Sequence, residues 1–234
     1  MKKPVIGIVV RNDIIDDQTF LVLNDEYRMA ILKAGGIPLL ICPTNLGDYG
    51  KTHVEDMEKL TDAEKENLYQ LLSLCDGFLM PGGNRWYEID EIICQYAYDH
   101  DLPYLGICLG MQLLGSLDNF HQGKTSDQTI KNQTNINHDQ PKIPYVHKII
   151  LYPSKLQDIL GKNEISVNSR HSYHLEEKDF FVISSRSEDG LIEGIELPNR
   201  RFMIGVQWHP ESMISYDSSM ILLFESFVQS CRKK

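Results

Sequence analysis

The chain has 234 residues, of which 42% are hydrophobic and 24% charged, and these values are ordinary for a globular protein with a sizeable core. Its formal net charge of -10 argues against nucleic acid or an anionic membrane as a partner. The apolar runs are too short to span a bilayer, and the first residues, MKKPVIGIVV, lack the features of a signal peptide, so we expect a cytoplasmic protein.

Strand and helix patterns alternate through the first half of the chain. Short apolar runs predict strands over residues 4–10, 37–41, 77–80 and 102–107. Apolar residues at helical spacing predict helices over residues 23–34, 61–75 and 89–96, and from about residue 109 onward. Such alternation is typical of a parallel sheet with helices on both faces, where ligands bind beyond the carboxyl ends of the strands.

The second half is richer in strands than in helices. Residues 118–144 are polar and predict a long surface loop. After them, strands are predicted over residues 145–151, 165–168, 180–185, 191–196 and 202–208, with helices over 154–160 and 217–230. We therefore predict one α/β domain over residues 1–234, a flavodoxin-like three-layer sandwich. Its central sheet would be mostly parallel, with antiparallel strands added from the C-terminal half.

One cysteine stands between two glycines at the end of a predicted strand. In LGICLGMQ, Cys108 is flanked by Gly106 and Gly110 and opens a predicted helix. A tight strand-to-helix turn of this kind exposes a nucleophile, and the helix N-terminus favours the thiolate. The backbone N–H of Leu109, together with a second one from the Pro-Gly-Gly run (81–83), would face an oxyanion.

A base for this thiol is predicted at His209. It follows a predicted strand in GVQWHPES, and Glu211, two residues on, projects to the same side of an extended segment. Nucleophile, base and orienting carboxylate would form a triad by role. The other seven histidines have no comparably strong sequence context. Either short motif alone is compatible with a purely structural turn, but their joint occurrence favours a cysteine-dependent enzyme.

The three motifs PGG (81–83), GICLGMQ (106–112) and GVQWHPE (205–211) resemble the class I glutamine amidotransferase superfamily. The resemblance implies attack of Cys108 on a γ-glutamyl amide and formation of a γ-glutamyl thioester. His209 would be general base and acid, and Glu211 its orienting partner. Gly83 and Leu109 would form the oxyanion hole, and Gln112 would help to hold the glutamyl group.

Within that superfamily the chain looks most like the γ-glutamyl-γ-aminobutyrate hydrolase family. The similar segments are NDEYRMAILKAGGIPLLICP (24–43), VNSRHSYHL (167–175) and EDGLIEGIE (188–196). This resemblance implies that His171, Ser172 and Gly82 lie at the glutamyl group, although His171 and His174 also fit a surface turn without a role. No carboxylate or cysteine partner is evident for a metal pair at these histidines, so no metal and no cofactor is expected.

The run PGGNRWYEID departs from the family pattern and leaves the amine specificity open. Arg85, Trp86 and Tyr87 could face the leaving group, or Trp86 and Tyr87 could simply cap the next helix. The expected function is hydrolysis of a small γ-glutamyl amide. Alternatives are a glutaminase subunit that feeds a separate synthase, or a non-catalytic binding protein. Neither nucleic acid nor membrane is an expected partner, and the sequence leaves a homodimer open.

Overall fold

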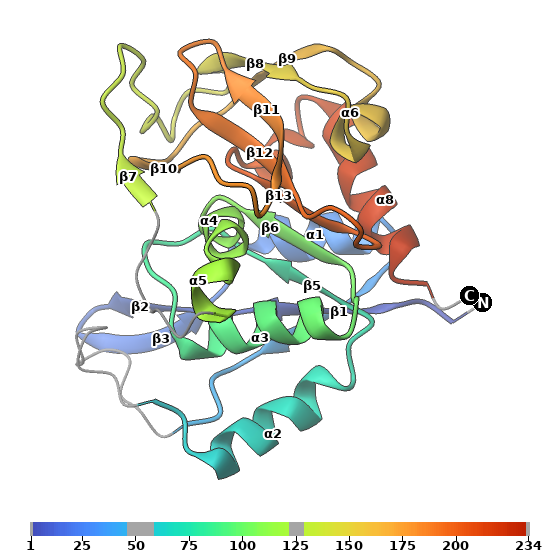
Figure 1. The fold of residues 1–234 in the computed structure, drawn as a ribbon. Coiled ribbons are helices and arrows are strands. Elements are labelled where there is room, and N and C mark those ends of the chain that lie inside the picture. Colours follow the sequence, from blue (N-terminus) through green and yellow to red (C-terminus); the bar gives the residue numbers. More distant parts are fainter. Residues whose placement is uncertain (1, 46–58, 122–128, 233–234) are drawn as a thin grey trace.

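The computed structural model describes residues 2–45, 59–121 and 129–232, and in these residues one nine-stranded sheet organises the fold (Figure 1). Its parallel half has the order β4 (Ile37–Ile41), β1 (Val5–Val9), β5 (Gly77–Met80), β6 (Tyr104–Ile107) and β13 (Met203–Val206). Its antiparallel half continues with β12 (Ile192–Glu196), β11 (Val182–Ser187), β8 (His147–Leu151) and β9 (Glu164–Val167).

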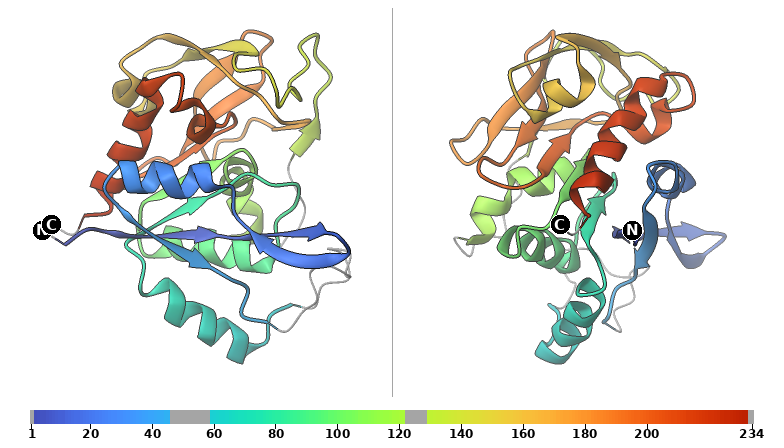
Figure 2. Two further views of the ribbon diagram at one scale, coloured as in Figure 1. Left: turned by 180° about the vertical axis from the view of Figure 1, so that it is seen from behind. Right: turned by 90° about the vertical axis from the view of Figure 1, so that its right-hand side faces the viewer.

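Helices cover both faces of the sheet and give three layers (Figure 2). On one face lie α1 (Asp25–Lys33), α6 (Lys155–Leu160) and α8 (Ile221–Ser230), preceded by α7 (Pro210–Met213) and the short 3-10 helix η2 (Ser218–Met220). On the other lie α2 (Asp62–Leu72), α3 (Glu88–Asp99) and α4 (Leu109–Gly115), with α5 (Leu117–His121) beside α3. Each face has its own apolar core, so the predicted α/β sandwich is confirmed.

Local sequence explains where several helices begin. Thr61 and Glu64 form the predicted capping box of α2, in which each side chain accepts a hydrogen bond from the other residue's backbone N–H. Ser154 caps α6 through its side chain, which accepts a hydrogen bond from the backbone N–H of Gln157. These caps satisfy N–H groups that the first turn of a helix leaves unpaired.

A hairpin next to β1 was not predicted. β2 (Arg11–Ile15) pairs antiparallel with β3 (Gln18–Val22) and forms a separate two-stranded sheet. The turn uses Asp16 and Asp17 with φ of 51° and 59°. A two-residue turn with positive φ at both positions usually carries Asn-Gly or Asp-Gly, so the Asp-Asp pair hid it from the sequence pattern.

The expected loop over residues 118–144 is more ordered than predicted, although its residues 122–128 lie outside the described chain. β7 (Thr129–Lys131) pairs with a second unpredicted strand, β10 (Tyr173–Leu175), and Asp139 bridges to Arg170. His138 in this segment is only 2% exposed. The prediction of a surface loop was therefore wrong at residues 118–121, which belong to α5, at the strand residues 129–131 and at the buried His138, whereas most of residues 132–144 are irregular and at least partly exposed.

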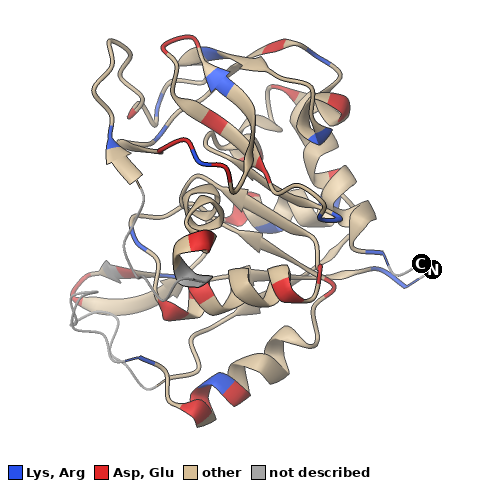
Figure 3. Cartoon of the chain, viewed as in Figure 1, with Lys and Arg blue, Asp and Glu red and all other residues tan. Residues whose placement is uncertain are grey.

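Acidic and basic residues are distributed differently over the helices and strands. Acidic residues are frequent on α2 and α3, whereas lysine and arginine are scattered over several elements (Figure 3). Within the described residues, no helix combines the length and apolar character needed to cross a bilayer. The cytoplasmic location and the absence of a nucleic-acid or membrane partner stay predictions.

Candidate active site

Cys108 stands at the sharp turn between β6 and α4. Its φ of 52° and ψ of -104° lie outside the regions that most side chains adopt. The Cys108 N–H donates to the Val206 carbonyl at 2.8 Å, and the Cys108 carbonyl accepts from the N–H groups of Met111 and Gln112 at 3.1 Å. Bonds to the neighbouring strand and to the helix thus hold the strained residue in place.

The two flanking glycines are required by close backbone approach. A Cβ on Gly106 would overlap the Gly110 carbonyl, and a Cβ on Gly110 would overlap the Met80 carbonyl oxygen of β5. Both obstacles are backbone atoms, which cannot rotate away. The Gly-x-Cys-x-Gly pattern therefore has the physical cause that the sequence suggested, namely that no side chain fits beside the turn.

His209 and Glu211 lie at the end of the neighbouring strand β13, where α7 begins. His209 Nδ1 is 2.7 Å from Glu211 Oε1, so the ring donates its Nδ1–H to the carboxylate. Asn168 fixes the His209 backbone from both sides, since its side chain accepts from His209 N at 2.8 Å and donates to His209 O at 2.9 Å. Both His209 and Glu211 are buried.

Electrostatics favour an ion pair between the thiol and the imidazole. Burial opposes ionisation of Cys108, but hydrogen bonding and charge from His209, with a smaller effect of His171, outweigh it and lower the pKa of the thiol. Burial likewise lowers the pKa of His209, yet Glu211 and the thiolate raise it to about 10. The two shifts act in the same direction, so both favour a thiolate beside an imidazolium.

The Pro-Gly-Gly run lies against the same turn. A Cβ on Gly82 would come within 2.7 Å of His209 Cε1 and 3.5 Å of Cys108 Cβ. Gly83 is next to Leu109, whose side chain would be 3.2 Å from a Cβ added there. Leu109 is the first residue of α4, so its N–H has no acceptor within the helix. The structure thus brings together every residue predicted for nucleophile, base, orienting partner and oxyanion hole.

Comparison with known proteins gives the family. The sequence profile described as Peptidase C26 matches residues 4–211, which include Cys108, His209 and Glu211. The chain belongs to the Peptidase C26 family. This family assignment confirms the class I glutamine amidotransferase-like resemblance at the level of the superfamily, and the fold agrees with it.

Relatives of this Peptidase C26 chain include both short proteins and parts of larger enzymes. It is 30% identical to a Schizosaccharomyces pombe protein named provisionally as a glutamine amidotransferase, over 88% of this chain and 81% of that one. It is 32% identical to CTP synthase of Staphylococcus carnosus, over 92% of this chain but only 43% of that enzyme. In fold it resembles the glutaminase domain of Trypanosoma brucei CTPS with bound acivicin, with a TM-score of 0.62, 19% identity and coverage of 99% and 96% of the two chains.

The predicted substrate residues of this Peptidase C26 member lie in different settings. Gln112 is buried, and its Nε2 donates to Tyr173 O at 3.0 Å and to Gln207 Oε1 at 3.2 Å. His171 is buried and close enough to Cys108 to interact with its charge, whereas the Ser172 side chain is exposed. Their contacts with a glutamyl group stay predictions.

The sequence left open whether Trp86 and Tyr87 face the leaving group or cap the next helix, and their contacts agree with capping. Tyr87 is the N-cap residue of α3, its N–H donates to Asp90 Oδ2 at 2.8 Å, and its hydroxyl donates to Asn12. Trp86 Nε1 donates to Glu91 of the same helix at 3.2 Å. The Trp86 ring and the Tyr87 backbone therefore serve the start of α3, in agreement with the capping alternative, while the Tyr87 hydroxyl contacts β2 and Arg85 is exposed.

Two residues that hold the Pro-Gly-Gly run escaped the sequence analysis. The Tyr27 hydroxyl accepts from Gly82 N at 2.9 Å and lies 3.4 Å from His209 Nδ1. Arg11 donates to Asp90 at 2.5 Å and to the Pro81 carbonyl at 3.3 Å. Tyr27 lies within the predicted helix over residues 23–34, and Arg11 directly follows the predicted strand over residues 4–10. No local pattern links either residue to a segment so far along the chain.

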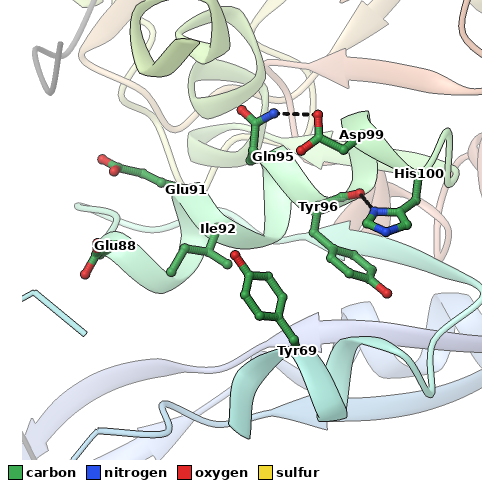
Figure 4. Close-up of a pocket in the computed structure, with 8 residues that line it drawn as sticks. All are labelled: Tyr69, Glu88, Glu91, Ile92, Gln95, Tyr96, Asp99 and His100. Carbon is green, nitrogen blue, oxygen red and sulfur yellow. Dashed lines mark hydrogen bonds between the residues drawn. The ribbon is translucent and has the colours of Figure 1, made fainter. Parts of the chain in front are cut away.

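A separate hollow lies on the outer side of α3 (Figure 4). It has a volume of about 500 Å³, and acidic, aromatic and other polar side chains of α2 and α3 line it, among them Tyr69, Glu88, Glu91, Tyr96 and Asp99. None of its lining residues belongs to the Cys108 site. The hollow is therefore separate from the candidate catalytic residues at the strand ends.

Alkylation should single out Cys108 among the thiols. Because its pKa is lowered, its reaction with iodoacetamide should continue to a lower pH than that of free N-acetylcysteine. Cys42, which is exposed, is an internal comparison, whereas burial raises the pKa of Cys75 and of Cys94 to about 12. Peptide mapping at several pH values measures each rate. In His209→Asn the Cys108 profile should move to higher pH, and an unchanged profile would remove the ion pair.

Tyr27→Phe should slow turnover about tenfold, a loss typical of one functional hydrogen bond. The change removes the hydroxyl that accepts from Gly82 N–H and lies near His209 Nδ1, while the ring stays packed. Steady-state kinetics on the best substrate measures it. Tyr69→Phe, on α2 and partly exposed, is the matched control and should keep full activity. Equal rates for both variants would show that the Tyr27 hydroxyl has no part in positioning.

Proposed function

We propose that this Peptidase C26 protein hydrolyses the amide bond of a small γ-glutamyl amine and releases glutamate and an amine. The observation that supports this most is the placement of Cys108 at a strained turn beside the His209–Glu211 pair. Gly83 and Leu109 lie side by side next to this turn, and we propose that their backbone N–H groups bind the oxyanion. Such a set suits acyl transfer through a thioester.

In the acylation step the Cys108 thiolate attacks the γ-carbonyl carbon, and the carbonyl electron pair moves onto oxygen. The N–H groups of Gly83 and Leu109 bind that oxyanion. As it collapses, the C–N bond breaks, and the imidazolium of His209 gives its Nε2 proton to the departing amine. The products of this half-reaction are the free amine, a γ-glutamyl thioester on Cys108 and a neutral His209.

In the deacylation step neutral His209 takes a proton from water, and the hydroxide attacks the thioester carbon. The same oxyanion site binds the second tetrahedral intermediate. When the C–S bond breaks, glutamate leaves and the thiolate is restored beside the imidazolium. Glu211 accepts the Nδ1–H of His209 throughout, so it stabilises the imidazolium and keeps Nε2 directed at the reacting atoms.

Substrate recognition is proposed for the residues around this pair. Gly82 leaves room beside the His209 ring, and His171 is a buried imidazole close enough to Cys108 to interact with it electrostatically. Gln112 follows from the resemblance to the class I glutamine amidotransferase superfamily. Ser172 follows from the narrower resemblance to γ-glutamyl-γ-aminobutyrate hydrolases, which also supports a stand-alone hydrolase. The exposed Arg85 is the residue of the Pro-Gly-Gly continuation best placed to select the leaving amine, since Trp86 and Tyr87 are occupied at α3.

A second candidate is a glutaminase that passes ammonia to a separate synthase. It is favoured by the identity of 32% with CTP synthase, of which the chain spans 43%. The proposed chemistry at Cys108 is the same in both cases, because glutamine is itself a γ-glutamyl amide. The two functions differ in the leaving group and in dependence on a partner.

The deciding experiment measures glutamate release from glutamine, γ-glutamyl-aminobutyrate, γ-glutamyl-polyamines and γ-glutamyl dipeptides. Cys108→Ala is the blank. Rapid, Cys108-dependent release from one amine conjugate by the isolated chain would support the hydrolase and identify its substrate. If no amide releases glutamate while the Cys108 thiol still alkylates quickly, the glutaminase that needs a partner synthase would be favoured. If Cys108 neither turns over substrate nor alkylates quickly, both functions fail.

A further inference from the structure

Three histidines and one glutamate meet inside the protein beside the Cys108 site. They come from separate segments: His138 from the stretch after β7, His147 from β8, His171 from the loop after β9, and Glu193 from β12. All four side chains are almost fully buried. One potential ligand atom of each residue lies within 4.8 Å of all the others. Four separate segments of the chain thus bring these side chains close together.

The inner atoms of the cluster face one carboxylate oxygen. Glu193 Oε1 is 3.5 Å from His138 Nδ1, 3.4 Å from His147 Nε2 and 3.3 Å from His171 Nε2. His138 Nδ1 and His171 Nε2 are 3.2 Å apart. Glu193 Oε1 is nearly equidistant from the three inner nitrogens, at separations longer than an ordinary hydrogen bond of about 2.9 Å, so it faces a shared centre rather than one partner.

The outer nitrogens of the three rings point at acceptors. His138 Nε2 is 2.9 Å from Asp189 Oδ2, His171 Nδ1 is 3.0 Å from the Tyr173 carbonyl, and His147 Nδ1 is 3.3 Å from the Lys148 carbonyl. Carboxylate and carbonyl oxygens only accept, so the outer nitrogens carry the protons. In the neutral rings the inner nitrogens therefore present lone pairs toward Glu193. Such carboxylate–histidine and carbonyl–histidine contacts are the usual outer support of metal-bound histidines.

Lone pairs and a carboxylate repel each other when they share a dry interior. Among the described residues, His147 Nε2 and both Glu193 carboxylate oxygens are buried and make no hydrogen bond. His138 Nδ1 has the Ser169 hydroxyl at 3.3 Å and His171 Nε2 at 3.2 Å, so the unsatisfied inner atoms are His147 Nε2 and the Glu193 oxygens. Unpaired buried polar groups cost free energy, and an unpaired buried carboxylate costs most of all. A cation at the centre would satisfy all four residues at once.

We propose that His138, His147, His171 and Glu193 bind one first-row divalent metal ion, with Zn²⁺ as the best fit. Zinc binds imidazole nitrogen and carboxylate oxygen at about 2.0–2.2 Å in a tetrahedron, whose edges are then about 3.4 Å. The four separations given above, between 3.2 and 3.5 Å, agree with such edges. The two remaining edges join His147 Nε2 to His138 and to His171, and small movements of His147 would bring them to the same length.

The site is structural in character, because the protein supplies all four ligands and leaves no position for substrate. The metal would fasten the stretch around His138, which has little regular secondary structure, to β8 and β12. It would also fix the position of His171, which lies close to the Cys108 thiol. The expectation of no metal came from seeing only His171 and His174 in the sequence. That expectation did not include Glu193, the carboxylate that β12 provides.

The first test is the metal content of the full chain, purified without a histidine tag and dialysed against micromolar Zn²⁺. Plasma mass spectrometry should find one zinc per chain, and Co²⁺ in its place should give the intense visible absorption of a tetrahedral site. X-ray absorption should give three nitrogen ligands and one oxygen. Absence of bound metal would overturn the proposal without any variant. So would sulfur ligation, which would place the metal at a cysteine.

Variants locate the metal. His138→Asn and Glu193→Gln should each lose the zinc and the rise in Tm that zinc produces in the wild type. His100→Asn, an exposed histidine at the end of α3, should keep both. Cys108→Ser should also retain zinc, so that the metal site and the proposed function fail or survive independently. Zinc that persists in both cluster variants would assign it to another place and overturn the proposal.

Discussion

Cys108→Ser is expected to lower kcat/KM for the best γ-glutamyl amide by at least about 1,000-fold. Serine has nearly the same size, so the turn between β6 and α4 should keep its shape. The hydroxyl does not ionise beside His209 as the thiol does, and the resting ion pair is lost. The measurement is initial-rate glutamate release by wild type and variant under identical conditions.

Cys42→Ser is the control for this experiment, because Cys42 is an exposed free cysteine outside the site. It should retain full activity. Circular dichroism and Tm should be unchanged in both variants. A Cys108→Ser enzyme that keeps more than about a tenth of the wild-type rate would show that the thiol is not the nucleophile.

Gly110→Ala should abolish activity and destabilise the fold by about 3 kcal/mol, the upper end of ordinary overpacking costs. The new methyl group would overlap the Met80 carbonyl oxygen, so either β5 or the first turn of α4 must move. Either movement displaces Cys108 relative to Gly83 and His209. Urea unfolding measures the stability change, and active-site alkylation reports whether Cys108 still reacts quickly.

Gly161→Ala separates a general effect of glycine replacement from the effect at the turn. Gly161 ends α6 with φ of 63°, and a Cβ there would meet open space. Its cost should be about 1 kcal/mol from the left-handed backbone alone, with normal activity. If both variants behaved alike, the close approach of α4 to β5 would not explain the glycine at 110.

The sequence predicted the parallel half of the fold well because local physics dominates there. Buried parallel strands such as β1 and β5 are continuous apolar runs, and the capping box at Thr61 marks the start of α2. The hairpin of β2 and β3 was missed because its turn lacks glycine and its strands are mostly polar or exposed. The short β7–β10 pair was missed because it depends on partners far apart in the chain.

The reactive residues were predictable because each stands in a local motif whose chemistry is specific. Cys108 lies between obligatory glycines, and Glu211 lies two residues after His209. The residues around them were not predictable in this way. Tyr27 reaches Gly82 across 55 positions of sequence, and a tyrosine within an apolar helix pattern indicates only burial.

The sequence position of Glu193 indicates a buried carboxylate that needs a partner. It stands in the middle of β12, a strand whose five residues are all buried, where a charged residue demands a partner. A buried acidic residue inside an apolar strand pattern is a reason to search the rest of the chain for histidines. His147 and His138 could have been considered on that ground.

The pairing of β6 with β13 has a consequence for how this protein can diversify. Cys108 and His209 follow neighbouring parallel strands, in which Ile107 is directly opposite Val206. The separation of the two reacting groups is therefore inherited from the spacing of a hydrogen-bonded ladder. The segments around Arg85, His138 and Ser172 lie outside that ladder. Substitutions in those segments can therefore change the surroundings of Cys108 and His209 without changing the spacing of the two strands that carry them.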